Sequence, residues 1–104
     1  MRTTNAKPSI TTTSVVVAVK DQVSADLAGE AVILSLRTGM YYGLNPVGAR
    51  IWTLLGTPTR VRDIRDAIVQ QYDVEEGRCE RDILGVLQRL AAHGLVEATD
   101  ATDP

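Results

Sequence analysis

The fold of this chain is decided by residues 37–52, which read Arg37-Thr38-Gly39-Met40-Tyr41-Tyr42-Gly43-Leu44-Asn45-Pro46-Val47-Gly48-Ala49-Arg50-Ile51-Trp52. Gly39 suits the left-handed position of a tight hairpin turn, and the residues after it predict a strand from Met40 to Leu44. Asn45 is a good helix N-cap and Pro46 a good first helical residue, so a helix starts where the strand ends. The segment therefore sets an aromatic strand directly beside the start of a helix.

The register of this hairpin is predicted from the apolar pattern. A three-residue loop, Arg37 to Gly39, puts six apolar residues on one face by pairing Leu36 with Met40, Leu34 with Tyr42 and Val32 with Leu44. A two-residue loop would scatter the apolar side chains over both faces. We therefore expect the three-residue loop, which leaves a sparser opposite face made of Ile33, Ser35, Tyr41 and Gly43.

Three strands followed by three helices are predicted. The strands run from Ser14 to Lys20, from Ala31 to Leu36 and from Met40 to Leu44. The helices cover 46–55, then a stretch from a Thr59 cap to Tyr72 or Asp73, then Glu75 or Glu76 to Ala92 or His93, with Gly94 as the stop and Leu95 and Val96 tucked back. The predicted fold class is α+β: a three-stranded antiparallel sheet followed by three helices, winged helix-turn-helix-like in arrangement.

Length and composition predict one ordinary globular domain, since the chain has 104 residues, of which 44% are hydrophobic and 23% charged. We expect this domain over 13–98, with flexible polar tails at 1–12 and 99–104. No apolar run approaches the roughly 18 residues of a membrane span, and the first residues lack the apolar segment of a signal peptide. The sequence thus predicts a cytoplasmic protein with no membrane partner.

Few residues in the chain can do chemistry. The single cysteine, Cys79, and the single histidine, His93, cannot make an all-protein Cys/His zinc cage or an internal disulfide. His93 falls at a predicted helix C-terminus, where capping of the last carbonyls is its expected role. Cys79 is expected to act as a small apolar residue, with a reactive thiol as the alternative. We therefore predict no catalytic residue, no metal site and no cofactor.

The winged-helix arrangement makes DNA binding an alternative that the charges can test. The net charge is −2 and the pI about 5.3. From Cys79 to His93 two arginines are cancelled by two acidic residues, and from Arg60 to Tyr72 the net charge is only +1. Because neutralising phosphates requires a basic face, DNA binding is disfavoured and no nucleic-acid partner is expected.

The third helix carries more apolar residues than a two-layer core needs. Seven of them spread over an arc of about 160°, against roughly 100° for an ordinary surface helix: Cys79, Ile83, Leu84, Val86, Leu87, Leu90 and Ala91. Part of this arc faces a groove, or the helix is the covered centre of a small bundle. Asp82 borders the arc with Arg89 two turns later, so Asp82 either orients a ligand or is a solvated surface carboxylate.

The order of short motifs along the chain resembles that of the PqqD-like RiPP recognition elements, over about residues 15 to 97. The motifs are Thr38 to Pro46, Gly48-Ala49, Ile51-Trp52, Asp63-Ile64, Tyr72-Asp73-Val74, Asp82-Ile83, Leu87 and Gly94-Leu95-Val96. Arg60 and Gly77 depart from the family pattern, and both bear on helix ends. The resemblance implies a domain that binds the leader segment of a ribosomally made precursor peptide and delivers it to a processing enzyme.

The resemblance also implies a site, because in such families the leader adds a strand beside the third strand and lies against the third helix. Carried onto this chain, the docking strand is Met40, Tyr41, Tyr42, Gly43 and Leu44, the apolar wall is Ile83, Val86, Leu87 and Leu90, and Asp82 and Arg89 fix polar groups of the peptide. The strand is most like that of the leader-binding half of split lasso-peptide B proteins, whose partner is a separate leader peptidase. The alternative is a peptide carrier in pyrroloquinoline quinone biosynthesis with a radical SAM partner.

Overall fold

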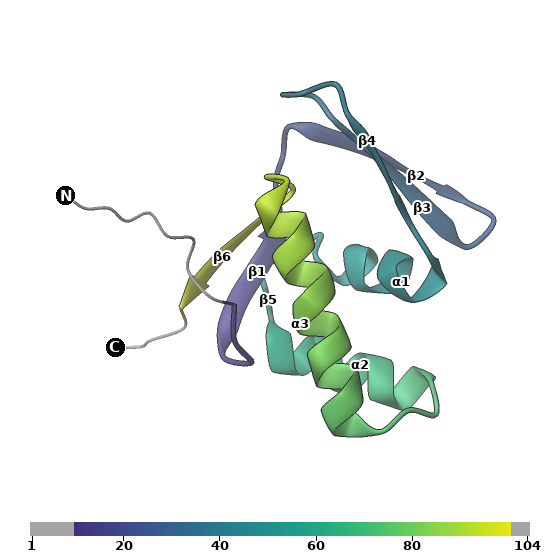
Figure 1. Cartoon of the computed structure of the whole chain (residues 1–104), viewed down its shortest axis with the longest axis vertical. Helices are drawn as coiled ribbons and strands as arrows, with labels where there is room; N and C mark the ends of the chain where they lie inside the picture. The colour runs from purple at the N-terminus through teal and green to yellow at the C-terminus, as the bar shows by residue number, and fades with distance from the viewer. Residues whose placement is uncertain (1–9, 101–104) are drawn as a thin grey trace.

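The computed structural model describes residues 10–100 and contains six strands and three helices in that range (Figure 1). In chain order they are β1 (Ser14–Ala18), β2 (Gln22–Leu27), β3 (Glu30–Ser35), β4 (Tyr41–Leu44), α1 (Pro46–Leu54), β5 (Thr59–Arg60), α2 (Val61–Gln71), α3 (Glu76–Ala92) and β6 (Val96–Asp100). The predicted class, α+β with a three-stranded antiparallel sheet and three helices, is confirmed.

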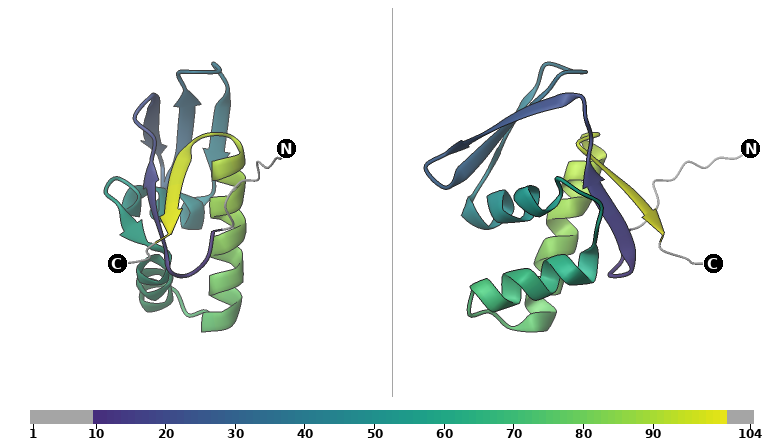
Figure 2. Two further views of the ribbon diagram at one scale, coloured as in Figure 1. Left: turned by 90° about the vertical axis from the view of Figure 1, so that its left-hand side faces the viewer. Right: turned by 180° about the vertical axis from the view of Figure 1, so that it is seen from behind.

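The strands form two antiparallel sheets, of order β2-β3-β4 and β5-β1-β6. The first sheet lies beside α1 at one end of the molecule, and α2 lies at the other end (Figure 1). In both views of Figure 2, β6 runs alongside β1, with which it pairs from Val96 to Asp100. α3 runs along the molecule and packs against α2 and β6.

The first strand of the predicted sheet is wrong. The strand expected from Ser14 to Lys20 exists as β1, but it pairs with β5 and β6, and the third strand of the hairpin sheet is β2. The sequence does not predict β2, because its middle residues, Ser24-Ala25-Asp26, have low strand propensity. The turn between β2 and β3 is not predicted by the sequence either. Ala28 and Gly29 form a two-residue turn with φ of 58° and 86°, and Ala28 is an unusual residue for a left-handed position.

The β3–β4 register also differs from the prediction by one residue. Ile33 lies opposite Tyr42 and Leu34 opposite Tyr41, and the loop has four residues, closed by a 2.9 Å hydrogen bond from Ser35 N to Met40 O. Gly39 does adopt the expected left-handed conformation, with φ 76°. Residues 31–36 are apolar on both faces, so alternation alone cannot fix which face is buried.

The shifted register reverses the predicted faces of β3. Ile33 is fully buried and Ser35 nearly so, whereas Val32 and Leu34 are only half-buried on the outer face of the sheet. On the inner face, Ser24 accepts a 3.1 Å hydrogen bond from the indole Nε1 of Trp52 in α1. α1 therefore covers the face that the sequence pattern had assigned to the surface.

The helix boundaries follow from caps, with one correction. The Asn45 side chain accepts a 2.8 Å hydrogen bond from Gly48 N, as expected for the N-cap of α1. Thr59 was predicted to cap α2, but the N-cap residue is Arg60, which makes no side-chain cap bond. Thr59 lies in β5 instead, where its hydroxyl donates to Leu54 O at 2.8 Å. The β-strand pairing of residue 59 thus moves the start of α2 by one residue.

The end of α3 is a Schellman motif. His93 is the C-cap, Gly94 has φ 73°, and bonds run from Leu95 N to Leu90 O at 2.9 Å and from Gly94 N to Ala91 O at 3.0 Å. This turn reverses the chain so that β6 can run back along β1. The predicted stop at Gly94 is confirmed, and the tuck of Leu95 and Val96 is the start of a strand.

The core joins all parts of the fold. Its most buried large side chains are Ile33, Ile51, Leu55, Ile64, Ile83, Leu87 and Leu95. Ile10, which was expected in the N-terminal tail, is 4% exposed and belongs to the same core. Thr99 and Asp100, expected to open the C-terminal tail, pair with Val15 and Ser14. Thr12, also expected in the N-terminal tail, accepts a 3.1 Å hydrogen bond from Arg62 N. The predicted tail residues 1–9 and 101–104 lie outside the described residues. No helix within 10–100 combines the length and apolarity needed to cross a membrane.

Two glycines of α3 and its cap give opposite predictions for stability. Gly94→Ala should lower the free energy of unfolding by about 1–2 kcal/mol, since its φ is left-handed and the added Cβ would lie 2.6 Å from Arg37 Nη2. Gly85→Ala is the matched control, because Gly85 lies inside a helix and an added Cβ would meet no atom of the described residues within 4 Å. It should stabilise the protein by about 0.5–1 kcal/mol. Urea unfolding of both variants measures this, and equal effects would contradict the cap geometry.

Candidate functional site

β4 is an edge strand. In the order β2-β3-β4 only one side of β4 is hydrogen-bonded, to β3, so the backbone donors and acceptors on its other side have no sheet partner within residues 10–100. This free side of Tyr41–Leu44 borders a groove whose opposite wall is α3. An extended segment entering there can complete the hydrogen bonds of the sheet.

We call the space between β4 and α3 the strand groove. It has a volume of about 380 Å³ and is lined by Tyr41, Tyr42, Gly43 and Leu44 of β4 and by Val86, Arg89, Leu90 and His93 at the end of α3. The Tyr42 and His93 rings contact each other with centroids 4.8 Å apart and planes inclined by 44°. This ring contact joins the two walls at the hairpin end of the groove.

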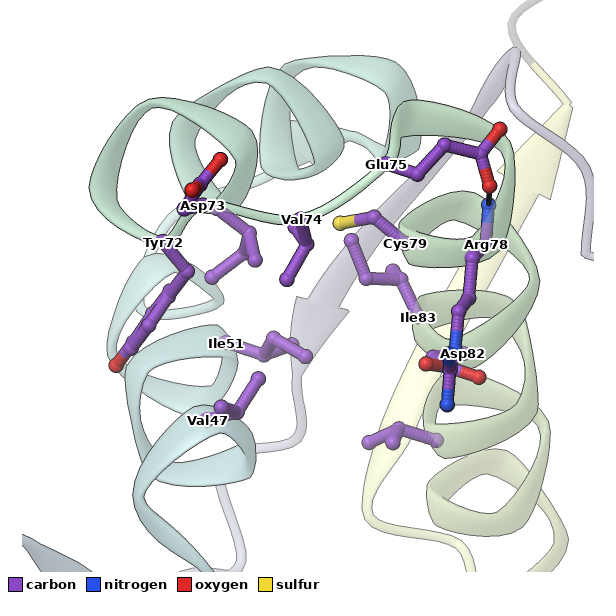
Figure 3. A pocket seen from close by; sticks show the side chains of 12 residues that line it. Val47, Ile51, Tyr72, Asp73, Val74, Glu75, Arg78, Cys79, Asp82 and Ile83 are labelled. Carbon is purple, nitrogen blue, oxygen red and sulfur yellow. Dashed lines mark hydrogen bonds between the residues drawn. The ribbon is translucent and has the colours of Figure 1, made fainter.

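A second hollow, the helix pocket, lies farther along α3 between α1, the α2–α3 loop and the start of α3 (Figure 3). It has a volume of about 480 Å³ and is lined by Val47, Ile51, Ile68, Tyr72, Asp73, Val74, Glu75, Arg78, Cys79, Asp82, Ile83 and Val86. Figure 3 shows Val47 and Ile51 of α1 on one side and Ile83 and Cys79 of α3 on the other. Val86 lines both hollows, which makes them neighbours along one face of α3.

The structure brings most of the predicted site residues to these two hollows. Tyr41 to Leu44, Val86, Arg89 and Leu90 line the strand groove, and Asp82 and Ile83 line the helix pocket. Met40 lines neither and is 56% exposed, and Leu87 lines neither because it is fully buried in the core. The role of the whole set in binding stays a prediction.

Two groups of lining residues were missed from the sequence. His93 was assigned only a capping role, and it is the C-cap of α3, but its ring also forms part of the strand groove. The α1 and α2–α3 loop residues of the helix pocket come together only through helix packing, which periodicity does not show. The Tyr72-Asp73-Val74 motif was the available signal for that loop.

The helix pocket contains the one cysteine, and its environment favours the neutral thiol. Burial raises the pKa of Cys79, the negative charge of Asp82 raises the pKa further, and Arg65 opposes this to a smaller extent. A nucleophilic cysteine needs the opposite shift. Within the described part of the chain, no cluster of His, Cys, Asp and Glu has the arrangement of a metal site.

Cys79 should therefore react slowly with thiol reagents. Because the pKa of Cys79 is raised, a smaller fraction of it is thiolate at pH 8 than for a free cysteine. Its side chain is also only 5% exposed. We expect alkylation by iodoacetamide, followed by mass spectrometry, to be at least about tenfold slower for the folded protein than for the protein in denaturant. Equal rates in the two states would mean that the thiol is accessible and activated.

The fold and the groove together define a class: a small α+β domain whose open sheet edge faces a helix across an apolar groove. The family model described as coenzyme PQQ synthesis protein D (PqqD) matches residues 30–96, more than half of the chain. The chain belongs to the PqqD family and is a PqqD-like RiPP recognition element, as its motifs indicated.

Two solved structures are similar to this one. "TbiB1 in Complex with the TbiA(beta) Leader Peptide" is 39% identical over 85% of this chain and 99% of that chain, with a TM-score of 0.72. "Lasso peptide synthetase B1 complexed with the leader peptide" is 26% identical over 79% of this chain and 96% of that chain, with a TM-score of 0.70. A search of curated proteins gives no match.

Proposed function

We propose that this chain binds the leader region of a ribosomally synthesised precursor peptide and presents it to a processing enzyme, a lasso-peptide leader peptidase. The leader adds a strand to the free side of β4 and lies against α3. The observation that carries the proposal is the unpaired edge of Tyr41–Leu44 facing the strand groove. Strand addition at such an edge draws affinity from main-chain hydrogen bonds and specificity from side-chain pockets.

The groove supplies both kinds of contact. The β4 edge offers backbone groups, and Leu44, Val86 and Leu90 offer apolar surface on its two walls. In an added strand alternate side chains point to the same side, so every second residue of the leader would face these apolar residues. Because the helix pocket continues the same face of α3, a leader longer than β4 has a second place to bury a side chain.

The structural neighbours support the leader as the ligand. Both were solved with a leader peptide bound, and this chain matches 99% and 96% of their length. The 39% identity to TbiB1 means that the two chains are similar in sequence as well as in fold. The lasso pathway is thus the better-supported setting for the proposal.

A neighbouring surface, which shares Tyr41 with the strand groove, is available for the processing enzyme. The outer face and hairpin end of the β2-β3-β4 sheet expose Val23, Leu27, Leu36, Met40 and Tyr41, each more than half exposed. Exposed apolar side chains gathered on one side of a small domain are typical of contacts with another protein. This surface adjoins the strand groove at β4, so an enzyme docked there would lie next to the bound leader.

A second candidate is favoured by the description of the matching family, which is a coenzyme PQQ synthesis protein. In that case the chain would carry a precursor peptide to a radical SAM enzyme. The fold and the groove would serve either partner, since both require only that the peptide be held. The partner enzyme, and not the mode of peptide binding, distinguishes the two candidates.

Strand addition predicts an alternating response to backbone methylation of the ligand. The probe is a synthetic copy of the TbiA(beta) leader, which the similar TbiB1 structure contains, with a single N-methyl group at successive positions. Methylation of amides that face β4 removes a ladder donor and should weaken binding by about tenfold, and methylation of the amides between them should change it little. Calorimetric titration measures the affinities. A response without a two-residue period would show that the leader is not added as a strand.

If the protein is a peptide carrier, it should accelerate cleavage by the processing enzyme and leave the precursor covalently unchanged on its own. Precursor incubated with the protein alone should keep its mass, and addition of the protein to precursor plus leader peptidase should raise the cleavage rate several-fold. A precursor with a scrambled leader is the control, and its cleavage should not respond. A covalent change of the precursor that depends on Cys79 or His93 would contradict the proposal. Acceleration of a radical SAM enzyme in place of the peptidase would favour the second candidate.

A further inference from the structure

One stripe of α3 connects the strand groove and the helix pocket. It consists of Arg78, Asp82, Val86, Arg89 and His93, which recur every three or four residues and each line one or both hollows. Over these residues the helix rises about 22 Å, the length of about seven residues of extended chain. The two hollows and this stripe form one trough along α3.

The two ends of the trough carry opposite charge. The helix pocket is lined by Asp73, Glu75 and Asp82 against the single guanidinium of Arg78. The strand groove is lined by Arg89 and His93, and no carboxylate is among its lining residues within the described chain. The trough is therefore acidic at its α1 end and basic at its hairpin end.

Arg37 adds to the positive end. Its Nη2 lies where it would be 2.6 Å from a Cβ on Gly94, so the guanidinium packs against the turn that ends α3. This places a second arginine near the hairpin end, contributed by the β3–β4 loop. The positive charge there comes from two elements that are distant in sequence.

The helix dipole explains only part of this order. Carboxylates at the N-terminus and arginines at the C-terminus of a helix are favoured on any helix, which accounts for Glu75 and for Arg89. The dipole effect fades within the first and last turns. Asp82 lies beyond the first turn of α3 and Asp73 lies outside the helix, so neither is required by the dipole. Their shared position on the wall of an apolar pocket suits a ligand.

The direction of β4 determines which end of a bound peptide would meet each charged end of the trough. β4 runs from the hairpin end of the trough to the α1 end, and its sheet is antiparallel throughout. A strand added antiparallel would have its N-terminal side over the helix pocket and its C-terminal side beside Arg89. Asp82 and Arg89 are about 10 Å apart along the helix axis, which corresponds to about three residues of extended chain.

We propose that the trough selects a leader with a basic residue before its strand segment and an acidic residue roughly three to five positions later, on its C-terminal side. This proposal rests on the leader-binding function and adds the charge pattern of the peptide that is preferred. The acidic residue lies beside Arg89 and the basic residue lies beside Asp82. Complementary charges along a groove fix the register of a ligand and disfavour its reverse orientation.

A display library tests the pattern. The probe is the leader used above, with the positions flanking its strand segment randomised and the full chain as bait. The selected pool should be enriched in Lys or Arg on the N-terminal flank and in Asp or Glu on the C-terminal flank. A pool that binds with no such order would overturn the charge proposal and leave leader binding intact. The absence of any binder, the unaltered leader included, would overturn both.

Charge-reversed variants with matched controls complete the experiment. Arg89→Glu should weaken a peptide selected on the parent by about three- to tenfold, and changing the peptide's acidic residue to Lys should recover most of the loss. Arg81→Glu makes the same charge change on α3 but lies outside both hollows, and should have no such effect. Asp82→Lys and the β6 control Glu97→Lys test the other end in the same way. If Arg89→Glu and Arg81→Glu behave alike while both melt like the parent, the proposal is wrong.

Discussion

The direct junction between β4 and α1 is the constraint on which the rest of the structure depends. Leu44 ends the strand, Asn45 caps the helix through Gly48 N at 2.8 Å, and no linker separates them. A Cβ on Gly48 would lie 3.3 Å from both the Leu44 Cβ and the Asn45 Oδ1, so the first turn of α1 sits directly against the end of the strand. This close approach fixes the angle between β4 and α1. Since α1 covers the inner face of the sheet and also forms a wall of the helix pocket, the same junction positions both hollows relative to each other.

Local signals in the sequence predicted the helices well and the sheets less well. Asn45, Pro46, Gly39 and Gly94 act through their own backbone preferences, and the structure places each where expected. The pairing of β1 is instead non-local. Its partner β6 lies some eighty residues later in the chain, and no local pattern encodes that pairing. The same limit explains the site. The residues on β4 and α3 followed from the family motifs, while the α1 wall of the helix pocket depends on how three helices pack.

The open edge of β4 is a hazard as well as the binding edge of the proposed function. An unpaired strand edge can pair with any extended chain, and small proteins usually protect such edges with charges, bulges or a covering element. Here β4 is only four residues long and α3 stands opposite its free side, with His93 against Tyr42. In the proposed binding mode these features limit what can enter the strand groove, because a peptide there must be extended, narrow and apolar on one side. On this proposal, the geometry that protects the edge also selects the ligand.

The sharing of α3 between core and trough restricts how such a protein can change its ligand. Ile83 and Leu90 line the hollows but are 1% and 4% exposed, so most of their contacts are with the core. Replacing a side chain of this kind costs about 2–5 kcal/mol of a stability that is itself only about 5–15 kcal/mol in ordinary domains. The rim of the trough is free of this restriction, because Asp82 and Arg89 are exposed and make no ion pair within the described residues. If the trough binds the leader as proposed, substitution of Asp82 or Arg89 alters which peptide is bound while the buried residues beneath it are kept, and the charge order along α3 is the part of the site most open to variation.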